Sequence, residues 1–488
     1  MSSSPAAEAG GSVFRHAPAR PPAVAANAMV ATSQPLATRA GLRVLERGGN
    51  AVDAAVAAAA VLCVAEPMAT GIGGDCFALV WKDGTLTGLD AAGPAALAAD
   101  PDAPVATSGP ASVTLPGAVA GWAALCERHG TLGLDSLLAD AVDAAERGVA
   151  AGAVTAAVWA AAPAPRELGP PPRLGQRFTL PELGSTLRLI ADEGAAGFYE
   201  GSVARAVAGA TLLTEEELRA FRPRWVEPLR LSYRGVTVCE LPAPTQGVAA
   251  LAGLGLLALG EPTFAAQVEC VSLGLEDALA HVRDGVDVSP LLEPERLEQR
   301  RRSAAAAVAE PAGGTVYLCA VDGDGTAVSF IQSLFDRFGS GVVAPGTGVC
   351  LHNRGACFAV GGRVEPGRRP FHTIIPGLLL RERRLLGPFG VMGAFIQAQA
   401  HVQLVSALVD DGLDPQAALD RPRFRVERDE VALEEPLWER APEIEALGRK
   451  PILSRDRALF GGGQAIVVAD DVLLGGSDAR KDGYAAGF

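Results

Sequence analysis

Two glycines and a hydroxyl residue open a strand–turn–strand segment that spans residues 313–341. Residues 316–321 form an apolar, β-prone run, and residues 326–334 resume the same pattern. The sequence Asp-Gly-Asp-Gly lies between the two runs, and these residues tolerate the positive φ angles of a tight turn. The segment therefore predicts a β-hairpin whose first strand begins at Thr315.

The position of Thr315 allows two interpretations. If the chain is cut between Gly314 and Thr315, this threonine carries both a hydroxyl nucleophile and a free α-amine. An α-amine has an ordinary pKa near ~8 and can accept the proton of the hydroxyl. If the chain is not cut, Thr315 only begins a buried hairpin, which is a common arrangement. The hairpin by itself leaves both interpretations open.

Composition excludes several classes of function. The chain has 488 residues and is 49% hydrophobic, which is enough for a large core. Its formal net charge of −14 argues against nucleic acid or an anionic membrane as a partner. The eight cysteines are scattered without a CxxC pair, so we expect no metal, no cofactor and no disulfide framework. No apolar stretch is long enough to span a bilayer, and we expect a soluble, cytoplasmic protein with reduced cysteines.

Two glycine-rich segments occur in the first hundred residues. Residues 48–55 join a helix that ends near Glu46 to a second helix, residues 51–64, which is apolar on all sides and should be buried. Residues 71–74 precede a hairpin with its turn at residues 82–84. Glycines at such places let chain segments approach closely. A phosphate-binding loop is the alternative, but no Lys-Ser/Thr pair follows.

Later segments extend this pattern of mixed helices and strands. Residues 112–122 lead into helices, and residues 463–468 predict a late strand. Residues 150–172 are rich in Ala and Pro and predict an irregular crossing over the surface. Residues 475–483 form a glycine- and charge-rich segment near the end of the chain.

Together these segments resemble the γ-glutamyltranspeptidase family, which belongs to the N-terminal nucleophile hydrolases, over residues 27–488. The resemblance implies an α+β fold, a four-layer αββα sandwich built from two autoprocessed subunits. We expect a disordered tail at 1–26, a large subunit at 27–314 and a small subunit at 315–488. The two subunits of one precursor then stay partners, and a dimer of heterodimers is compatible with the resemblance. Many relatives are secreted, so a cytoplasmic location is a departure from the usual location of the family.

The resemblance also assigns a reaction centre. Thr315 matches the nucleophile, which becomes N-terminal by self-cleavage. Ser333, on the paired strand, matches a supporting hydroxyl that is usually a threonine. The oxyanion hole of the family uses the backbone N–H groups of a Gly-Gly pair, which reads Gly393-Ala394 in this chain. Backbone donors survive a change from Gly to Ala where φ is compatible.

The family holds the α-carboxylate of a γ-glutamyl group with an arginine and two serines. The arginine falls near Pro94, where this chain has no charge, and the serine pair reads His372-Thr373. His372 fits either a substrate ligand or a packed histidine.

The family holds the α-ammonium with an asparagine, a glutamine and an aspartate, and these positions read Phe335, Arg354 and Cys357. A missing acid and a new cation disfavour an ammonium, whereas Arg354 favours a carboxylate or another anion. Cys357 fits a small apolar filler better than a second nucleophile.

Three functional hypotheses follow. The first is an autoprocessing hydrolase or acyltransferase that attacks a carbonyl of a small molecule other than a plain γ-glutamyl peptide. One form of it is a C–C bond hydrolase of a natural-product pathway of the alkyl-proline type. The second is a true γ-glutamyltransferase or glutathione hydrolase with an altered clamp. The third is a non-catalytic pseudoenzyme, which the retention of Thr315, Ser333 and Gly393 disfavours.

Overall fold

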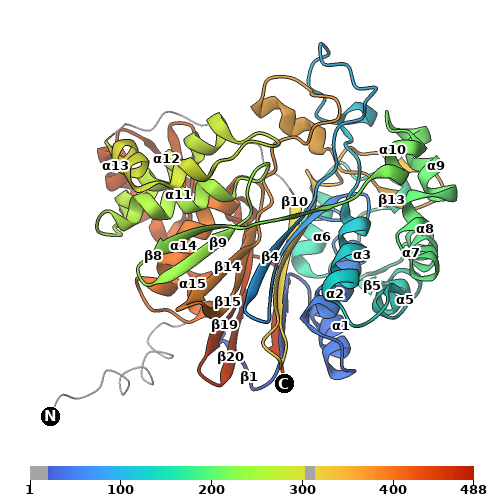
Figure 1. Cartoon of the computed structure of the whole chain (residues 1–488), viewed down its shortest axis with the longest axis horizontal. Helices are drawn as coiled ribbons and strands as arrows, with labels where there is room; N and C mark the ends of the chain where they lie inside the picture. Colours follow the sequence, from blue (N-terminus) through green and yellow to red (C-terminus); the bar gives the residue numbers. More distant parts are fainter. Residues whose placement is uncertain (1–19, 303–313) are drawn as a thin grey trace.

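The computed structural model describes residues 20–302 and 314–488. Two seven-stranded sheets lie face to face, and helices cover the outer face of each sheet (Figure 1). This is the four-layer αββα sandwich that the resemblance implied. Among the residues that the structure describes, no helix is long and apolar enough to cross a membrane.

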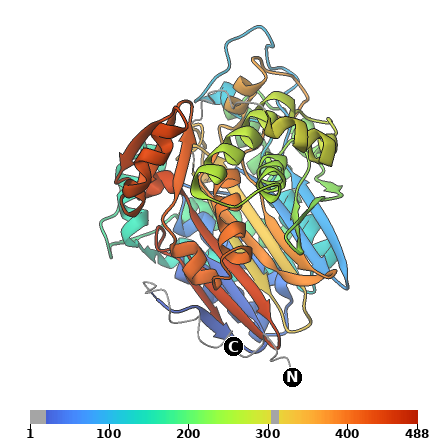
Figure 2. The ribbon, with the colours of Figure 1, turned by 90° about the vertical axis from the view of Figure 1, so that its left-hand side faces the viewer.

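The first sheet lies on the left of Figure 1 and has the strand order β1-β20-β19-β15-β14-β9-β8. Its strands are β1 (Ala23–Ala25), β20 (Val472–Ser477), β19 (Gly462–Ala469), β15 (Arg384–Met392), β14 (Gly377–Arg381), β9 (Val236–Glu240) and β8 (Leu229–Tyr233). Figure 2 shows the helices that cover it in front of these strands. They are α11 (Gly247–Ala258), α12 (Phe264–His281), α13 (Pro294–Arg301), α14 (Ile396–Val409) and α15 (Pro415–Asp420).

The second sheet has the order β21-β2-β10-β11-β3-β4-β7. Its strands are β21 (Tyr484–Gly487), β2 (Met29–Thr32), β10 (Gly314–Val321), β11 (Ala327–Phe335), β3 (Asp75–Lys82), β4 (Thr85–Ala91) and β7 (Arg224–Val226). The helices on its side of the molecule are α1 (Pro35–Glu46), α2 (Ala51–Ala65), α3 (Ala118–His129), α5 (Ala139–Arg147) and α7 (Pro181–Glu193). The predicted hairpins therefore form, and they pair with each other through β11 and β3.

The remaining elements are small and lie around these layers. They are α4 (Leu134–Leu137), β5 (Val149–Ala150), α6 (Ala153–Ala160), β6 (Arg177–Phe178), α8 (Ala196–Tyr199), α9 (Gly201–Ala210), α10 (Glu215–Ala220), β12 (Val343–Ala344), β13 (Val349–Cys350), β16 (Phe424–Glu427), β17 (Glu430–Glu434), α16 (Ala441–Ala446), β18 (Lys450–Ser454), and the 3-10 helices η3 (Pro110–Ser112), η4 (Arg166–Leu168), η5 (Ser289–Leu292), η6 (Arg354–Val360), η7 (Glu435–Arg440) and η8 (Arg457–Phe460).

Three apolar layers hold the sandwich together. Strand β10 contributes to two of them, because it is apolar on both of its faces. Val316 and Leu318 pack toward the helices, whereas Tyr317 and Cys319 pack into the layer between the sheets. This alternation is the period of a strand that is buried on both faces. Helix α2 is buried along its whole length, as the sequence predicted, and a capping box at Asn50 fixes its start.

Two expectations from the sequence need correction. The tail was expected to cover residues 1–26, but β1 pairs with β20 and the Arg20 side chain bonds to the carbonyl oxygens of Ser477 and Gly483. The rest of the predicted tail, residues 1–19, lies outside the described residues. The crossing at residues 150–172 contains α6, because Trp159 has an apolar site to fill beside Phe178 and Phe338.

Both sheets combine strands from the two sides of the predicted cut. The first sheet takes β1, β8 and β9 from the segment before residue 314, and the second takes β10, β11 and β21 from the segment after it. A cut between Gly314 and Thr315 would leave each chain with incomplete sheets and exposed apolar faces. The two chains are therefore expected to stay together after such a cut.

The glycines of residues 71–74 pack against the backbone of the hairpin. A Cβ atom on Gly74 would lie less than 3.0 Å from the carbonyl oxygen of Ser333, and one on Gly73 would lie equally close to the carbonyl oxygen of Cys350. Close approach of chain segments, rather than phosphate binding, thus accounts for this motif.

We expect Gly74→Ala to destabilise the protein by about 2 kcal/mol or more, because backbone atoms cannot move aside as a flexible side chain can. Urea unfolding measures the change in the free energy of unfolding. Gly209→Ala is the matched control, since Gly209 is exposed in α9 and a Cβ there meets no atom within 4 Å. Equal stability of the two variants would show that the segment at Gly74 is not tightly packed.

Candidate active site

Thr315 lies at an irregularity in the pairing of β10 with β11. Gly314 pairs with Phe335, Val316 pairs with Gln332, and the register shifts between these pairs. A bulge of this kind re-aims a side chain out of the regular pleat and is common beside active sites. Thr315 is nevertheless buried, with 2% of its surface exposed.

The Ser333 hydroxyl connects the side chain of Thr315 to the peptide bond before it. Ser333 Oγ lies 3.1 Å from Thr315 Oγ1 and donates to the carbonyl oxygen of Gly314 at 2.7 Å. The backbone N–H of Phe335 donates to the same Oγ at 2.8 Å. Because a hydroxyl has one proton and that of Ser333 is directed to Gly314, the Thr315 hydroxyl must donate to Ser333. The carbonyl of Gly314 is thus polarised next to a hydroxyl that could attack it.

A small cavity, of about 40 Å³, opens beside Thr315. Gly314, Thr315 and Gly393 all line this cavity, so the structure brings the predicted nucleophile and one half of the predicted oxyanion hole together. Gly393 has a φ of 127°, a conformation that favours glycine. Ala394 does not line the cavity. It adopts a φ of 60°, and its carbonyl accepts a hydrogen bond from Gln246 Nε2 at 3.1 Å.

The five residues predicted to bind substrate form a buried cluster, which adjoins the reaction centre through Phe335, the partner of Gly314 in the strand pairing. The Arg354 guanidinium stacks over the ring of Phe335 at 4.6 Å, and its Nη1 donates to Thr373 Oγ1 at 3.1 Å and to Cys357 Sγ at 3.7 Å. His372 belongs to the same cluster through Asp75. None of the five lines the cavity at Thr315. Their role as substrate ligands stays a prediction.

Asp75, which the sequence did not single out as a site residue, lies at the centre of this cluster. Its Oδ2 is 3.1 Å from His352 Nδ1, 3.2 Å from His372 Nε2 and 3.8 Å from Arg354 Nε. Burial opposes the charge of Asp75, but His352 and His372 outweigh it and hold its pKa below the ordinary value. The cluster therefore contains a carboxylate after all, although Arg354 Nε and Nη2 have no hydrogen-bond partner there.

His372 is neutral near pH 7. Burial lowers its pKa from the ordinary 6.5 to about 4, although Asp75 opposes this shift. Both ring nitrogens face acceptors, the carbonyl oxygen of Pro370 at 2.7 Å from Nδ1 and Asp75 Oδ2 at 3.2 Å from Nε2, so the neutral ring can donate to only one of them. The ring packs edge-on against Phe77, with the ring centroids 5.2 Å apart. These contacts are those of a packed histidine.

The segment around Pro94 has an arginine beside it that the sequence did not reveal. Arg369 Nε donates to the carbonyl oxygen of Ala92 at 2.7 Å and lies 3.7 Å from Asp90 Oδ2. Burial raises the pKa of Asp90 to about 6, against the effect of Arg369. The position near Pro94 is therefore occupied by a charge pair that joins the two sides of the predicted cut.

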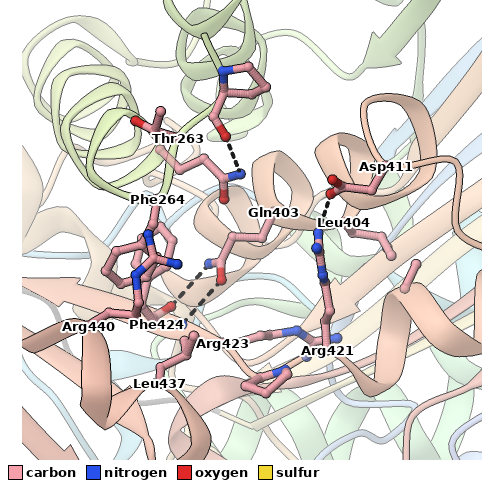
Figure 3. Close-up of a pocket in the computed structure, with 14 residues that line it drawn as sticks. Thr263, Phe264, Gln403, Leu404, Asp411, Arg421, Arg423, Phe424, Leu437 and Arg440 are labelled. Atoms are coloured by element: carbon pink, nitrogen blue, oxygen red, sulfur yellow. Dashed lines mark hydrogen bonds and ion pairs between the residues drawn. The ribbon is translucent and has the colours of Figure 1, made fainter. Parts of the chain in front are cut away.

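A larger cavity, of about 400 Å³, lies between α12, α14 and η7 (Figure 3). Its polar groups are already paired: Arg421 with Asp411, and Gln403 with the backbone of Phe424. It shares no lining residue with the cavity at Thr315. Within residues 20–302 and 314–488, no group of three or more His, Cys, Asp or Glu side chains could hold a metal ion.

Comparison with known proteins identifies the family. The model of the γ-glutamyltranspeptidase family matches residues 37–488. The chain belongs to the γ-glutamyltranspeptidase family. An oxamate amidohydrolase proenzyme of Klebsiella pneumoniae is 34% identical over 95% of this chain and 99% of its own length. The glutathione hydrolase-like YwrD proenzyme of Bacillus subtilis is 31% identical over 94% of this chain and 98% of its own length.

Among solved structures, a cephalosporin acylase from Bacillus halodurans superimposes with a TM-score of 0.91 at 37% identity. The match covers 97% of this chain and 98% of the acylase. The relatives named here are hydrolases, and those from Klebsiella and Bacillus subtilis are named as proenzymes. The family thus includes members with different substrates on one fold, and the substrate has to be argued from the site.

We expect Ser333→Ala to slow both self-cleavage and turnover by about tenfold or more while leaving the fold intact. The variant loses the donor to Gly314 and the acceptor for Thr315; one such bond is worth roughly 0.5–1.5 kcal/mol in a ground state and more in a transition state. Cleavage is followed by gel electrophoresis over time. Ser333→Thr keeps the hydroxyl and is expected to retain most of the rate. An unchanged rate in Ser333→Ala would rule out the proposed role of this hydroxyl.

Acid is expected to destabilise the protein through His372. Its pKa is about 4 when folded and near 6.5 when unfolded, so the unfolded chain binds more protons between these values and stability falls as the pH is lowered from 6.5 to 4. The full loss is on the order of 3 kcal/mol.

Urea unfolding of Thr315→Ala, expected to remain one chain, at several pH values measures this loss. Adding His372→Gln should flatten the pH dependence, whereas adding His281→Gln, at an exposed position, should leave it unchanged. Parallel curves for both variants would show that His372 does not cause the loss of stability at low pH.

Proposed function

We propose that this protein is an autoprocessing amidohydrolase of the γ-glutamyltranspeptidase family that uses Thr315 as its nucleophile. Its substrate is a small molecule other than a plain γ-glutamyl peptide. The observation that carries the proposal is the Ser333 hydroxyl, which contacts both Thr315 Oγ1 and the carbonyl oxygen of Gly314. The names of the relatives support the reaction class, since both an amidohydrolase and an acylase are among them.

Self-cleavage uses this geometry directly. Thr315 Oγ1 attacks the carbonyl carbon of Gly314, while Ser333 donates a hydrogen bond to the carbonyl oxygen as negative charge develops there. The C–N bond between Gly314 and Thr315 breaks, its nitrogen takes up the proton that the Thr315 hydroxyl loses, and an ester forms. Water then hydrolyses the ester to give the carboxylate of Gly314 and the free α-amine of Thr315.

Turnover repeats the same chemistry on an external amide. The α-amine of Thr315 accepts the hydroxyl proton as Oγ1 attacks the substrate carbonyl, and the N–H of Gly393 is proposed to stabilise the oxyanion. The proton passes to the leaving amine as the C–N bond breaks. Water hydrolyses the resulting ester, which releases the acid and restores the hydroxyl.

Two features argue against a γ-glutamyl substrate. The acid expected beside an α-ammonium is replaced by Cys357, and Asp75, the carboxylate in that cluster, already contacts His352, His372 and Arg354. The arginine near Pro94 is Arg369, and it is paired with Asp90. An α-ammonium or α-carboxylate buried at these places would lack a free partner, which typically costs several kcal/mol.

The first test is the intact mass of the purified protein. We expect two chains, residues 1–314 and 315–488, that elute together in gel filtration, and Thr315→Ala should remain a single inactive chain. N-terminal sequencing locates the cut. A cut at any other bond, or an active Thr315→Ala variant, would exclude Thr315 as the nucleophile.

The second test compares substrates on the cleaved enzyme. Glutathione and γ-glutamyl-p-nitroanilide should be turned over at least a hundredfold less efficiently than a small amide without an α-ammonium, because about 3 kcal/mol corresponds to that factor. Oxamate, the monoamide of oxalate, is the first such amide to try, with ammonia release as the readout. Glutathione turnover at an ordinary efficiency of roughly 10⁴ M⁻¹s⁻¹ would favour a true glutathione hydrolase.

A further inference from the structure

The charged side chains at the cavity beside Thr315 are all cations. Its lining includes Arg337, Arg480 and Lys481, and no aspartate or glutamate of the described chain lines it. This is unexpected in a chain with a formal net charge of −14. The local excess of positive charge lies where a substrate must enter to reach the hydroxyl of Thr315.

Arg480 does not contribute a free charge. Its Nε donates to Glu434 Oε1 at 2.9 Å and its Nη1 donates to Asp478 Oδ1 at 3.0 Å, while Nη2 donates to the carbonyl oxygen of Arg421 at 2.8 Å. The side chain is 3% exposed. These contacts hold the segment between β20 and β21 in place, so the role of Arg480 is structural.

Arg337 and Lys481 remain available. Arg337 follows β11 only four positions after Ser333, is half-buried, and has no hydrogen bond or ion pair with its side chain among residues 20–302 and 314–488. Lys481 is also half-buried and forms no salt bridge within the described part of the chain. Its charge acts on Glu66, but burial still raises the pKa of that carboxyl, which weakens Glu66 as a counter-ion.

We infer that Arg337 and Lys481 bind a carboxylate of the substrate, and that the enzyme selects amides whose acyl group carries a carboxylate close to the scissile carbonyl. This inference rests on the proposed function and names its substrate class. Both cations line the same small cavity as Thr315, so the carboxylate is separated from the reacting carbonyl by at most a few atoms. Charge-assisted hydrogen bonds from the two side chains then orient the carbonyl toward Oγ1.

The assignment differs from the one that the sequence favoured. Arg354 was expected to receive the anion, but it is fully buried, lies 3.8 Å from Asp75 and does not line this cavity. An anion at Arg354 would also have to approach the charge of Asp75. At Arg337 and Lys481 there is no such carboxylate on the cavity wall.

Oxamate and oxamide test this directly, because the two molecules have nearly the same shape and differ by one negative charge. Cleaved wild-type enzyme should hydrolyse oxamate with a kcat/KM at least tenfold above that for oxamide. Arg337→Gln and Lys481→Gln should each lower kcat/KM for oxamate about tenfold or more, mainly through KM, and leave oxamide hydrolysis within about twofold. Ammonia release measures both reactions.

Arg381→Gln is the matched control, since it removes the same charge from an exposed position at the end of β14. This variant should leave kcat/KM unchanged for both oxamate and oxamide. Equal losses for oxamate and oxamide in the Arg337 and Lys481 variants, or a wild type that does not distinguish the two amides, would overturn the inference while leaving the proposed function standing. A correctly cleaved wild type that hydrolyses neither oxamate nor oxamide would also overturn the inference, whereas an active Thr315→Ala variant would overturn the proposed function.

Discussion

The contact of the Ser333 hydroxyl with Thr315 and with the carbonyl oxygen of Gly314 is the interaction on which the proposed chemistry depends. It requires two adjacent strands in a fixed register with a bulge at Thr315. The register is held on one side by the apolar alternation of β10 and on the other by the pairing of β11 with β3. The Gly74 contact adds a third constraint, because it places the chain against the backbone of Ser333 itself. A site that must hold two hydroxyls within hydrogen-bond distance is best built on such rigid elements.

Much of this frame could be predicted from the sequence. The hairpin at Thr315, the buried helix α2 and the close approach of the glycines are each encoded by a local pattern of apolar residues, turn residues or missing side chains. The four layers followed from the resemblance. The end of the predicted tail was misplaced because β1 has only three residues and depends on pairing with β20, which is distant in the sequence.

The charges of the site could not be predicted in this way. Asp75 meets His352 and His372, which lie 277 and 297 residues later in the sequence, and no local pattern signals such a contact. Arg369 reaches Ala92 from the other side of the predicted cut in the same manner. Arg337 stands next to the recognised motif, but only the cavity at Thr315 distinguishes it from the other arginines. The family motif indicated which positions bind substrate in relatives. In this chain, the carboxylates near each cation decide which cation can bind an anionic substrate.

A net negative charge on the whole chain does not prevent a positively charged cavity from binding an anion, because the two sets of charges act on the anion over different distances. At an ionic strength of 0.15 M, surface charges are largely screened beyond about 8 Å, so the net charge of −14 repels a small anion only weakly during approach. Inside the cavity, partial burial reduces that screening, and the charges of Arg337 and Lys481 act at contact distance. Arg354, although fully buried, faces Asp75 at 3.8 Å and does not line the cavity at Thr315. Selection of an anionic acyl group therefore depends on which cation lacks a counter-ion, not on which cation is most deeply buried.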